Sequence, residues 1–190
     1  MLLSAARIRE LFDALDQELA QLSVVGEIGL LGGAVMCLVF QTREATRDVD
    51  AIFAPTREIR KAAGAVARAY GLPADWLNDA AKGFVLSAPP RTQVLELPNL
   101  RVWAPSAEYM LAMKCVSARY DTHDADDVAF LVQHLGLVSP GEVFERITRY
   151  YRLERVPAKT RFLVEELLGA SGDTGSEDRP GSSAGSGGER

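Results

Sequence analysis

Residues 27–53 read EIGLLGGAVMCLVFQTREATRDVDAIF, and this segment sets the expected architecture. Residues 27–31 form an apolar run typical of a buried strand, and the run leads directly into Gly32-Gly33. A helix is expected over 34–41, followed by a second strand over 47–53 that Pro55 ends. A strand, a glycine turn, a helix and a second strand predict a mixed α/β unit.

The remainder of the chain extends this unit on both sides. Further strands are expected at 92–97 and 100–104, joined by a turn at Pro98-Asn99, and one at 83–87. We therefore predict an α/β (α+β) fold with a small mixed sheet over 1–104 and a helical half of the same globular unit over 105–168. The helices, with their start or stop residues, are expected at 4–22 (Ser4 N-cap), 57–70 (Gly71), 106–119, 124–135 (Gly136), from Ser139 (capping box) and at 157–168.

Composition excludes several classes of protein. The net charge is −5, of which the Gly/Ser-rich segment 169–190, expected to be a disordered tail, carries −2. A globally basic nucleic-acid binder is thus excluded. Only Cys37 and Cys115 occur, in apolar contexts, which argues against a disulfide-stapled or Cys-ligated zinc fold. No apolar run approaches ~18 residues, so we expect a cytoplasmic protein without a membrane partner.

Asp48 and Asp50 are the strongest candidates for chemistry. Residues two apart on a strand point to the same face, so both carboxylates are expected on one side and Val49 on the other. Two such carboxylates suit a hard divalent cation, and magnesium completes its shell with water and substrate phosphates. The alternative for a lone Asp-x-Asp is a solvated strand face.

Gly32-Gly33 strengthens this interpretation. Backbone N–H groups at a helix start favour a phosphate, and glycine lets the backbone approach the ligand closely. By itself the pair could be an ordinary strand–helix turn. Together, the glycine pair and the acid pair would bracket a triphosphate.

These residues resemble the minimal nucleotidyltransferase superfamily. The stretch Leu31 to Ala34, followed by RxxTxDxD over 43–50, is similar to the AbiEii-type toxins and the MenT toxins of mycobacteria. The segment LAMK over 111–114, with 118–119 and 123–127, resembles the lysine-bearing helix and the acidic element of the same group. The segment DWLND over 75–79 looks like a signature of uncharacterised nucleotidyltransferase-like proteins. The resemblance covers about residues 25–135. It implies a nucleotide site of Gly32, Gly33, Arg47 and Lys114, with Mg²⁺, or Mn²⁺ as the alternative, on Asp48 and Asp50.

The sequence departs from the family pattern at two places. Gly33 stands where many members have serine, so no hydroxyl is expected from that position. A third metal carboxylate could come only from Glu96, the sole acid in 83–104, whose alternative role is a salt bridge at a sheet edge.

Lys114 and the acidic run 121–127 are further candidates. Lys114 lies in an otherwise apolar helix, where it is either a snorkelling surface lysine or a point charge on the triphosphate. The acids could simply cap a helix, or at least one could act at the site, with Asp124 and Asp127 first by motif position. His123 stands where the family has arginine, so a phosphate contact there would be weaker and pH-dependent.

Residues 145–161 form a local basic segment that contains six Lys or Arg residues and only two glutamates. Arg146, Arg149 and Arg152 are RNA-binding candidates, with Tyr150 and Tyr151 able to stack on bases. The alternative is a solvated helix face with the tyrosines in the core.

The resemblance also implies partners. The toxins modify the 3′ end of tRNA with a pyrimidine nucleotide from CTP or UTP, which blocks aminoacylation and growth. A cognate antitoxin would restrain the enzyme by binding or by phosphorylating Thr46, which is expected on the strand face of Asp48 and Asp50. The alternatives are a catalytically weak NTP-binding or interaction module, or a nucleotidyltransferase acting on a protein or small-molecule hydroxyl.

Overall fold

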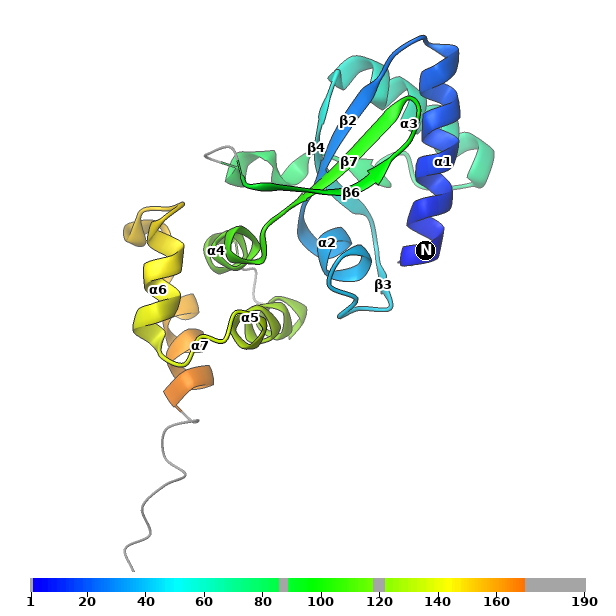
Figure 1. The fold of residues 1–190 in the computed structure, drawn as a ribbon. Coiled ribbons are helices and arrows are strands. Elements are labelled where there is room, and N and C mark those ends of the chain that lie inside the picture. Colours follow the sequence, from blue (N-terminus) through cyan, green and yellow to red (C-terminus); the bar gives the residue numbers. More distant parts are fainter. Residues whose placement is uncertain (1, 86–88, 118–121, 170–190) are drawn as a thin grey trace, which may run out of the picture.

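A twisted five-stranded mixed sheet forms the centre of the amino-terminal half (Figure 1). The structure is a computed structural model and describes residues 2–85, 89–117 and 122–169. The strand order is β5-β4-β2-β7-β6, in which β2 is antiparallel to β4 and parallel to β7. These strands are β2 (Gly26–Leu30), β4 (Val49–Ala54), β5 (Leu77–Asn78), β6 (Arg91–Glu96) and β7 (Leu100–Pro105). The predicted mixed α/β class is confirmed.

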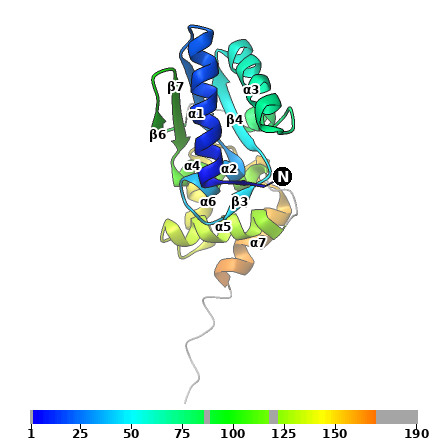
Figure 2. The ribbon, with the colours of Figure 1, turned by 90° about the vertical axis from the view of Figure 1, so that its right-hand side faces the viewer.

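Two helices, α1 (Ala5–Gln21) and α3 (Thr56–Tyr70), pack side by side against the sheet (Figure 2). Both helices lie close to β2 at Gly26, where an added Cβ would lie 2.9 Å from a Leu19 methyl and 3.2 Å from an Ile59 methyl. Ser4 caps α1 as predicted, by accepting a hydrogen bond from the Arg7 backbone N–H. Gly71 ends α3 in the left-handed conformation, as its position predicted.

The segment between the glycine pair and the acid pair differs from its prediction. Helix α2 (Gly32–Leu38) begins at the glycines and ends before residue 41. The chain then forms β3 (Ala45–Thr46), which pairs with β1 (Leu3–Ser4), and bends at residues 47–48 before β4. The predicted strand over 47–53 is therefore wrong at its start. Thr46 belongs to a separate two-stranded ribbon, so strand alternation does not relate it to Asp50.

The prediction of a strand over 83–87 is also wrong where the structure describes it. Residues 80–84 form a 3₁₀ helix, η1 (Ala80–Phe84), and residues 86–88 lie outside the described part. The strands β1, β3 and β5 have two residues each, which is too short for a period-two pattern to reveal them.

The carboxyl-terminal half is helical, as predicted. It consists of α4 (Ala107–Ser117), α5 (Thr122–His134), α6 (Pro140–Thr148), η2 (Leu153–Arg155) and α7 (Ala158–Gly169). The predicted capping box at Ser139 is confirmed, with both reciprocal hydrogen bonds to Glu142 present. One cluster of buried side chains runs from Leu3 in the first half to Val164 in α7. The expected tail, apart from Gly169, lies outside the described residues.

Candidate active site

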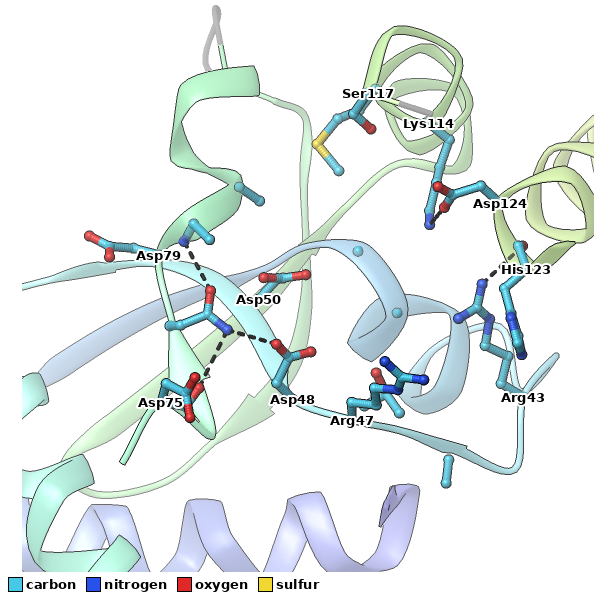
Figure 3. A pocket seen from close by; sticks show the side chains of 18 of the residues that line it. Arg43, Arg47, Asp48, Asp50, Asp75, Asp79, Lys114, Ser117, His123 and Asp124 are labelled. Carbon is cyan, nitrogen blue, oxygen red and sulfur yellow. Dashed lines mark hydrogen bonds and ion pairs between the residues drawn. The ribbon is translucent and has the colours of Figure 1, made fainter. Parts of the chain in front are cut away.

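A cavity of about 1060 Å³ opens where the start of α2, the bend before β4 and the helices α4 and α5 meet (Figure 3). Its size is at the upper end of the range for ligand pockets. The sequence predicted most of its charged lining. The predicted site residues that line it are Gly32, Gly33, Thr46, Arg47, Asp48, Asp50, Lys114, His123 and Asp124.

The two motif carboxylates meet at this cavity although only Asp50 lies in a strand. Asp48 belongs to the bend at residues 47–48, and Asp50 is the second residue of β4. In Figure 3 both carboxylates lie on the cavity side of this segment. The Leu31 backbone N–H donates to the Asp50 carbonyl oxygen at 2.8 Å, which ties the glycine turn to the acid pair.

The carboxylate oxygens of Asp48 and Asp50 are ligands of the kind that a hard divalent cation prefers. Across the described ranges, no group of three or more His, Cys, Asp or Glu side chains could enclose a metal ion. Asp48 and Asp50 provide carboxylate oxygens at an open cavity. Magnesium is commonly held by one or two carboxylates plus substrate phosphates and water, rather than by a full protein cage. The pair therefore fits magnesium or manganese bound together with a phosphate ligand.

An added Cβ would be crowded at both Gly32 and Gly33. Gly32 has φ +55°, and an added Cβ would lie 2.7 Å from Asp50 Oδ2. A Cβ on Gly33 would lie 2.7 Å from Thr46 Oγ1. Position 33 supplies no hydroxyl, as expected, but a hydroxyl from another residue lies there. Thr46 brings its own hydroxyl to the place that a serine side chain at position 33 would need.

Lys114 is held by two aspartates of α5. Its Nζ lies 2.6 Å from Asp124 Oδ1 and 2.8 Å from Asp127 Oδ2, and its side chain is 9% exposed. It is not a snorkelling surface lysine. The two aspartates differ in exposure, with Asp124 at 19% and Asp127 at 3%. Asp124 lines the cavity, whereas Asp127 does not. The geometry therefore makes Asp127 a partner of Lys114 rather than a group that could touch a ligand.

Arg43 begins the RxxTxDxD motif, but the sequence analysis assigned it no role at the site. Its guanidinium donates to both carboxylate oxygens of Asp127 and to the His123 carbonyl oxygen. It also lines the cavity. Its partner Asp127 is 84 residues away in the chain, so no local pattern could reveal the pairing. Asn78 was missed for the same reason, because its contact with Asp48 spans 30 residues.

Glu96 is not brought to the cavity. It ends β6, which is separated from β4 by β2 and β7, or about 14 Å at the usual strand spacing. Its carboxylate accepts from Gln93 at 2.8 Å and lies 3.9 Å from Arg101. The structure thus favours the edge-strand alternative over a role as the third metal carboxylate.

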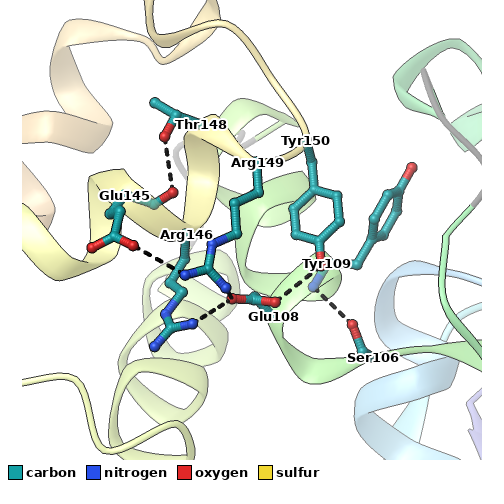
Figure 4. A network of polar contacts seen from close by, with 8 residues as sticks. All are labelled: Ser106, Glu108, Tyr109, Glu145, Arg146, Thr148, Arg149 and Tyr150. Carbon is teal, nitrogen blue, oxygen red and sulfur yellow. Dashed lines mark hydrogen bonds and ion pairs between the residues drawn. The ribbon is translucent and has the colours of Figure 1, made fainter.

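The basic segment forms a polar network with α4 (Figure 4). Arg146 and Arg149 donate to Glu108 Oε1 at 3.0 and 2.9 Å, and Tyr150 donates to Oε2 at 3.0 Å. Burial, followed by this bond to Glu108, raises the pKa of Tyr150. Glu108 thus offsets part of the positive charge of this face. Arg152 is exposed, and Tyr151 is buried in the core as the alternative interpretation expected.

Comparison with protein-family models, with curated proteins and with solved structures found no match. The resemblance to nucleotidyltransferases therefore depends on the sequence motifs alone. Within residues 2–85, 89–117 and 122–169, no helix has the length and apolar character needed to cross a membrane.

Proposed function

We propose that this chain is a magnesium-dependent nucleotidyltransferase that transfers a nucleotide from a nucleoside triphosphate to a hydroxyl group. The observation that carries the proposal is the convergence at one cavity of the glycine pair, the two carboxylates and Lys114. The glycine pair begins α2, Asp48 lies in the bend before β4, Asp50 lies in β4, and Lys114 lies in α4. Nucleotidyl transfer requires acidic residues that bind a cation and, opposite them, groups that bind the phosphates of the nucleotide.

Each residue type has a distinct task in this proposal. Asp48 and Asp50 would hold a divalent cation, whose chemistry is to neutralise phosphate charge and align an in-line displacement. The backbone at Gly32 and Gly33 gives the phosphates close access, because neither residue carries a Cβ. Lys114 supplies positive charge for the leaving pyrophosphate.

In the proposed reaction, the acceptor hydroxyl oxygen forms a bond to the α-phosphorus. The bond between that phosphorus and the bridging oxygen of the β-phosphate breaks, and its electron pair leaves with pyrophosphate. The hydroxyl proton passes to solvent. Lys114 must exchange part of its pairing with Asp124 and Asp127 for the phosphates. Asp127 keeps Arg43 as its partner throughout this exchange.

For the acceptor we propose the 3′ end of tRNA, with CTP or UTP as donor, as in the toxins that the motifs resemble. The exposed Arg152, together with Arg146 and Arg149, would provide phosphate contacts. Modified tRNA could not be aminoacylated, so a cognate antitoxin would be needed to restrain the protein. Thr46 lies at the cavity and would be the regulatory phosphorylation site, although its side chain is buried and a kinase would first have to displace the segment around β3.

One observation favours a second candidate, an NTP-binding or interaction module without turnover. Lys114 is neutralised by two carboxylates, and the cavity also has Asp75 and Asp79 in its lining. A lysine that is already neutralised supplies little charge to a leaving pyrophosphate, so such a site would bind an NTP together with its cation without turning it over. A transferase that modifies a protein or a small-molecule hydroxyl would use the same site with another acceptor.

The discriminating experiment incubates the protein with each α-labelled NTP, Mg²⁺ and total tRNA. Label transfer to tRNA that is lost in Asp48→Ala supports the enzyme. Tight NTP binding without transfer supports the module, and transfer to added protein or a small alcohol identifies the other acceptor class. Transfer that survives Asp48→Ala would overturn the site assignment.

A further inference from the structure

Asn78 lies in the segment DWLND, which none of the tasks above uses. It is the last residue of β5 and stands beside Asp50 in the parallel pair β4–β5. We propose that Asn78 is a positioning residue that orients the Asp48 carboxylate for cation binding. This inference rests on the proposed function, because it assigns a task at the same acid pair.

The neighbours of Asn78 fix its backbone. The Trp76 side chain is 1% exposed, and its indole Nε1–H donates to the Ala63 carbonyl oxygen in α3 at 3.0 Å. The Trp76 carbonyl oxygen accepts from the Val49 backbone N–H at 2.7 Å. The segment is therefore anchored on one side to α3 and on the other to the strand that carries Asp50.

The orientation of the Asn78 amide follows from its hydrogen-bond partners, which also include the Asp75 carbonyl oxygen, 3.5 Å from Nδ2. Its Oδ1 accepts from the Ala80 backbone N–H at 2.9 Å, which directs the amide nitrogen the other way. That nitrogen donates to Asp48 Oδ2 at 3.1 Å, a bond drawn as a dashed line at Asp48 in Figure 3. A flipped amide would place its oxygen against the carboxylate and its nitrogen against an N–H donor. Only the observed orientation satisfies the Ala80 donor and the two acceptors, Asp48 and the Asp75 carbonyl oxygen.

Asp48 needs such a partner because of where it lies. It belongs to a bend rather than to β4, so no strand ladder fixes its side chain. The hydrogen bond from Asn78 holds Oδ2 of Asp48 in place. The position of the other carboxylate oxygen, Oδ1, is thereby set before a cation binds. Asn78 is also neutral, so it orients the carboxylate without cancelling the charge that attracts a cation. Lysine or arginine at this place would compete with the cation. Groups that orient metal ligands in this way are typically worth 10–100-fold in metal affinity or activity.

The test compares Asn78→Ser and Asn78→Asp with wild type. Serine can still accept from the Ala80 N–H but is too short to reach Asp48, and aspartate keeps the shape but cannot donate. We expect Mn²⁺ affinity, measured by electron paramagnetic resonance without nucleotide, to fall about 10-fold in Asn78→Ser. In both variants kcat should fall by a similar factor while the KM for the nucleotide and the melting temperature stay unchanged. This separation of kcat from KM is not expected of a merely structural role.

The matched control is Arg60→Gln, which removes the paired contacts of Arg60 with Asp79, the next residue of the segment, at 2.9 and 2.8 Å. It should match wild type in both assays. Wild-type Mn²⁺ affinity and kcat in Asn78→Ser, or wild-type kcat in Asn78→Asp, would overturn the positioning role alone. If Asp48→Asn left Mn²⁺ binding intact, the acid pair would not be the cation site and the proposed function would fail with it.

Discussion

The Nζ of Lys114 lies 2.8 Å from Oδ2 of Asp127, a carboxylate whose side chain is only 3% exposed. Arg43 donates to the same carboxylate from the loop before β3. Asp127 therefore joins the segment that leads to the acid pair with the helix that carries Lys114. A buried carboxylate with two cationic partners is costly to disturb, because its loss removes the charge that pairs with Arg43 and one of the two that pair with Lys114.

We expect Asp127→Asn to lower the free energy of unfolding by roughly 3 kcal/mol. Asp124→Asn should cost about 1 kcal/mol or less, because the Asp124 side chain is 19% exposed and water can replace it. Urea unfolding followed by circular dichroism measures both values. Equal losses would contradict the view that Asp127 is the structural member of the pair.

Asp48→Asn should reduce nucleotide transfer by about 10²–10³-fold at saturating substrate, which corresponds to a loss of several kcal/mol of transition-state stabilisation. The fold should be preserved, because asparagine has the same shape and opens no cavity. The matched control is Asp126→Asn, an exposed aspartate of α5 that does not line the cavity. Full activity of Asp48→Asn at high Mg²⁺ would show that Asp48 is not a metal ligand.

The contact between Gly33 and Thr46 predicts a rescue. Gly33→Ser should impair nucleotide binding, because its Cβ would lie 2.7 Å from Thr46 Oγ1. Thr46→Ala removes that hydroxyl and should stay partly active, whereas Thr46→Glu should be inactive because its charge enters the cavity. The double variant Gly33→Ser with Thr46→Ala should bind nucleotide better than Gly33→Ser alone.

Nucleotide affinities from calorimetry provide the comparison, with Thr42→Glu as the control for added charge on an exposed neighbouring threonine. A double variant no better than Gly33→Ser would mean that the two positions do not share the same space. An active Thr46→Glu protein would also exclude control by phosphorylation at Thr46.

Arg149→Glu with Arg152→Glu should weaken tRNA binding and reduce its salt dependence, because fewer counterions are then released from RNA. Nucleotide binding should not change. Arg9→Glu with Arg57→Glu makes the same charge change on exposed positions of α1 and α3 and serves as the control. RNA affinity measured between about 50 and 200 mM salt gives both slopes. Equal salt dependence of RNA affinity in all three proteins would show that RNA does not bind to this face.

The thiol of Cys115 should be unreactive at pH 8, because burial raises its pKa to about 12 from 9.0. The folded state holds this proton more tightly than the unfolded chain does. Its stabilising contribution is therefore complete below pH 9 and is lost as the pH rises toward 12. Alkylation with iodoacetamide, read by mass spectrometry, should modify Cys115 only after unfolding. Rapid labelling of the native protein would contradict the burial.

The local patterns of the chain determined most of its elements. Ser4, Gly71 and the capping box at Ser139 end or begin helices through contacts within a few residues, so sequence reasoning could find them. The acid pair and the glycine pair were visible for the same reason, because each is a short motif with its own chemistry.

Only the tertiary structure decided how these parts meet. The bend before β4 removed Asp48 from its predicted strand, and three pairings across the chain set the site: Asn78 with Asp48, Arg43 with Asp127, and Thr46 against Gly33. The strand order placed Glu96 far from the acid pair. Periodicity acts over a few residues, whereas the contacts that orient a side chain join segments 13 to 84 residues apart and form only when the sheet and helices pack.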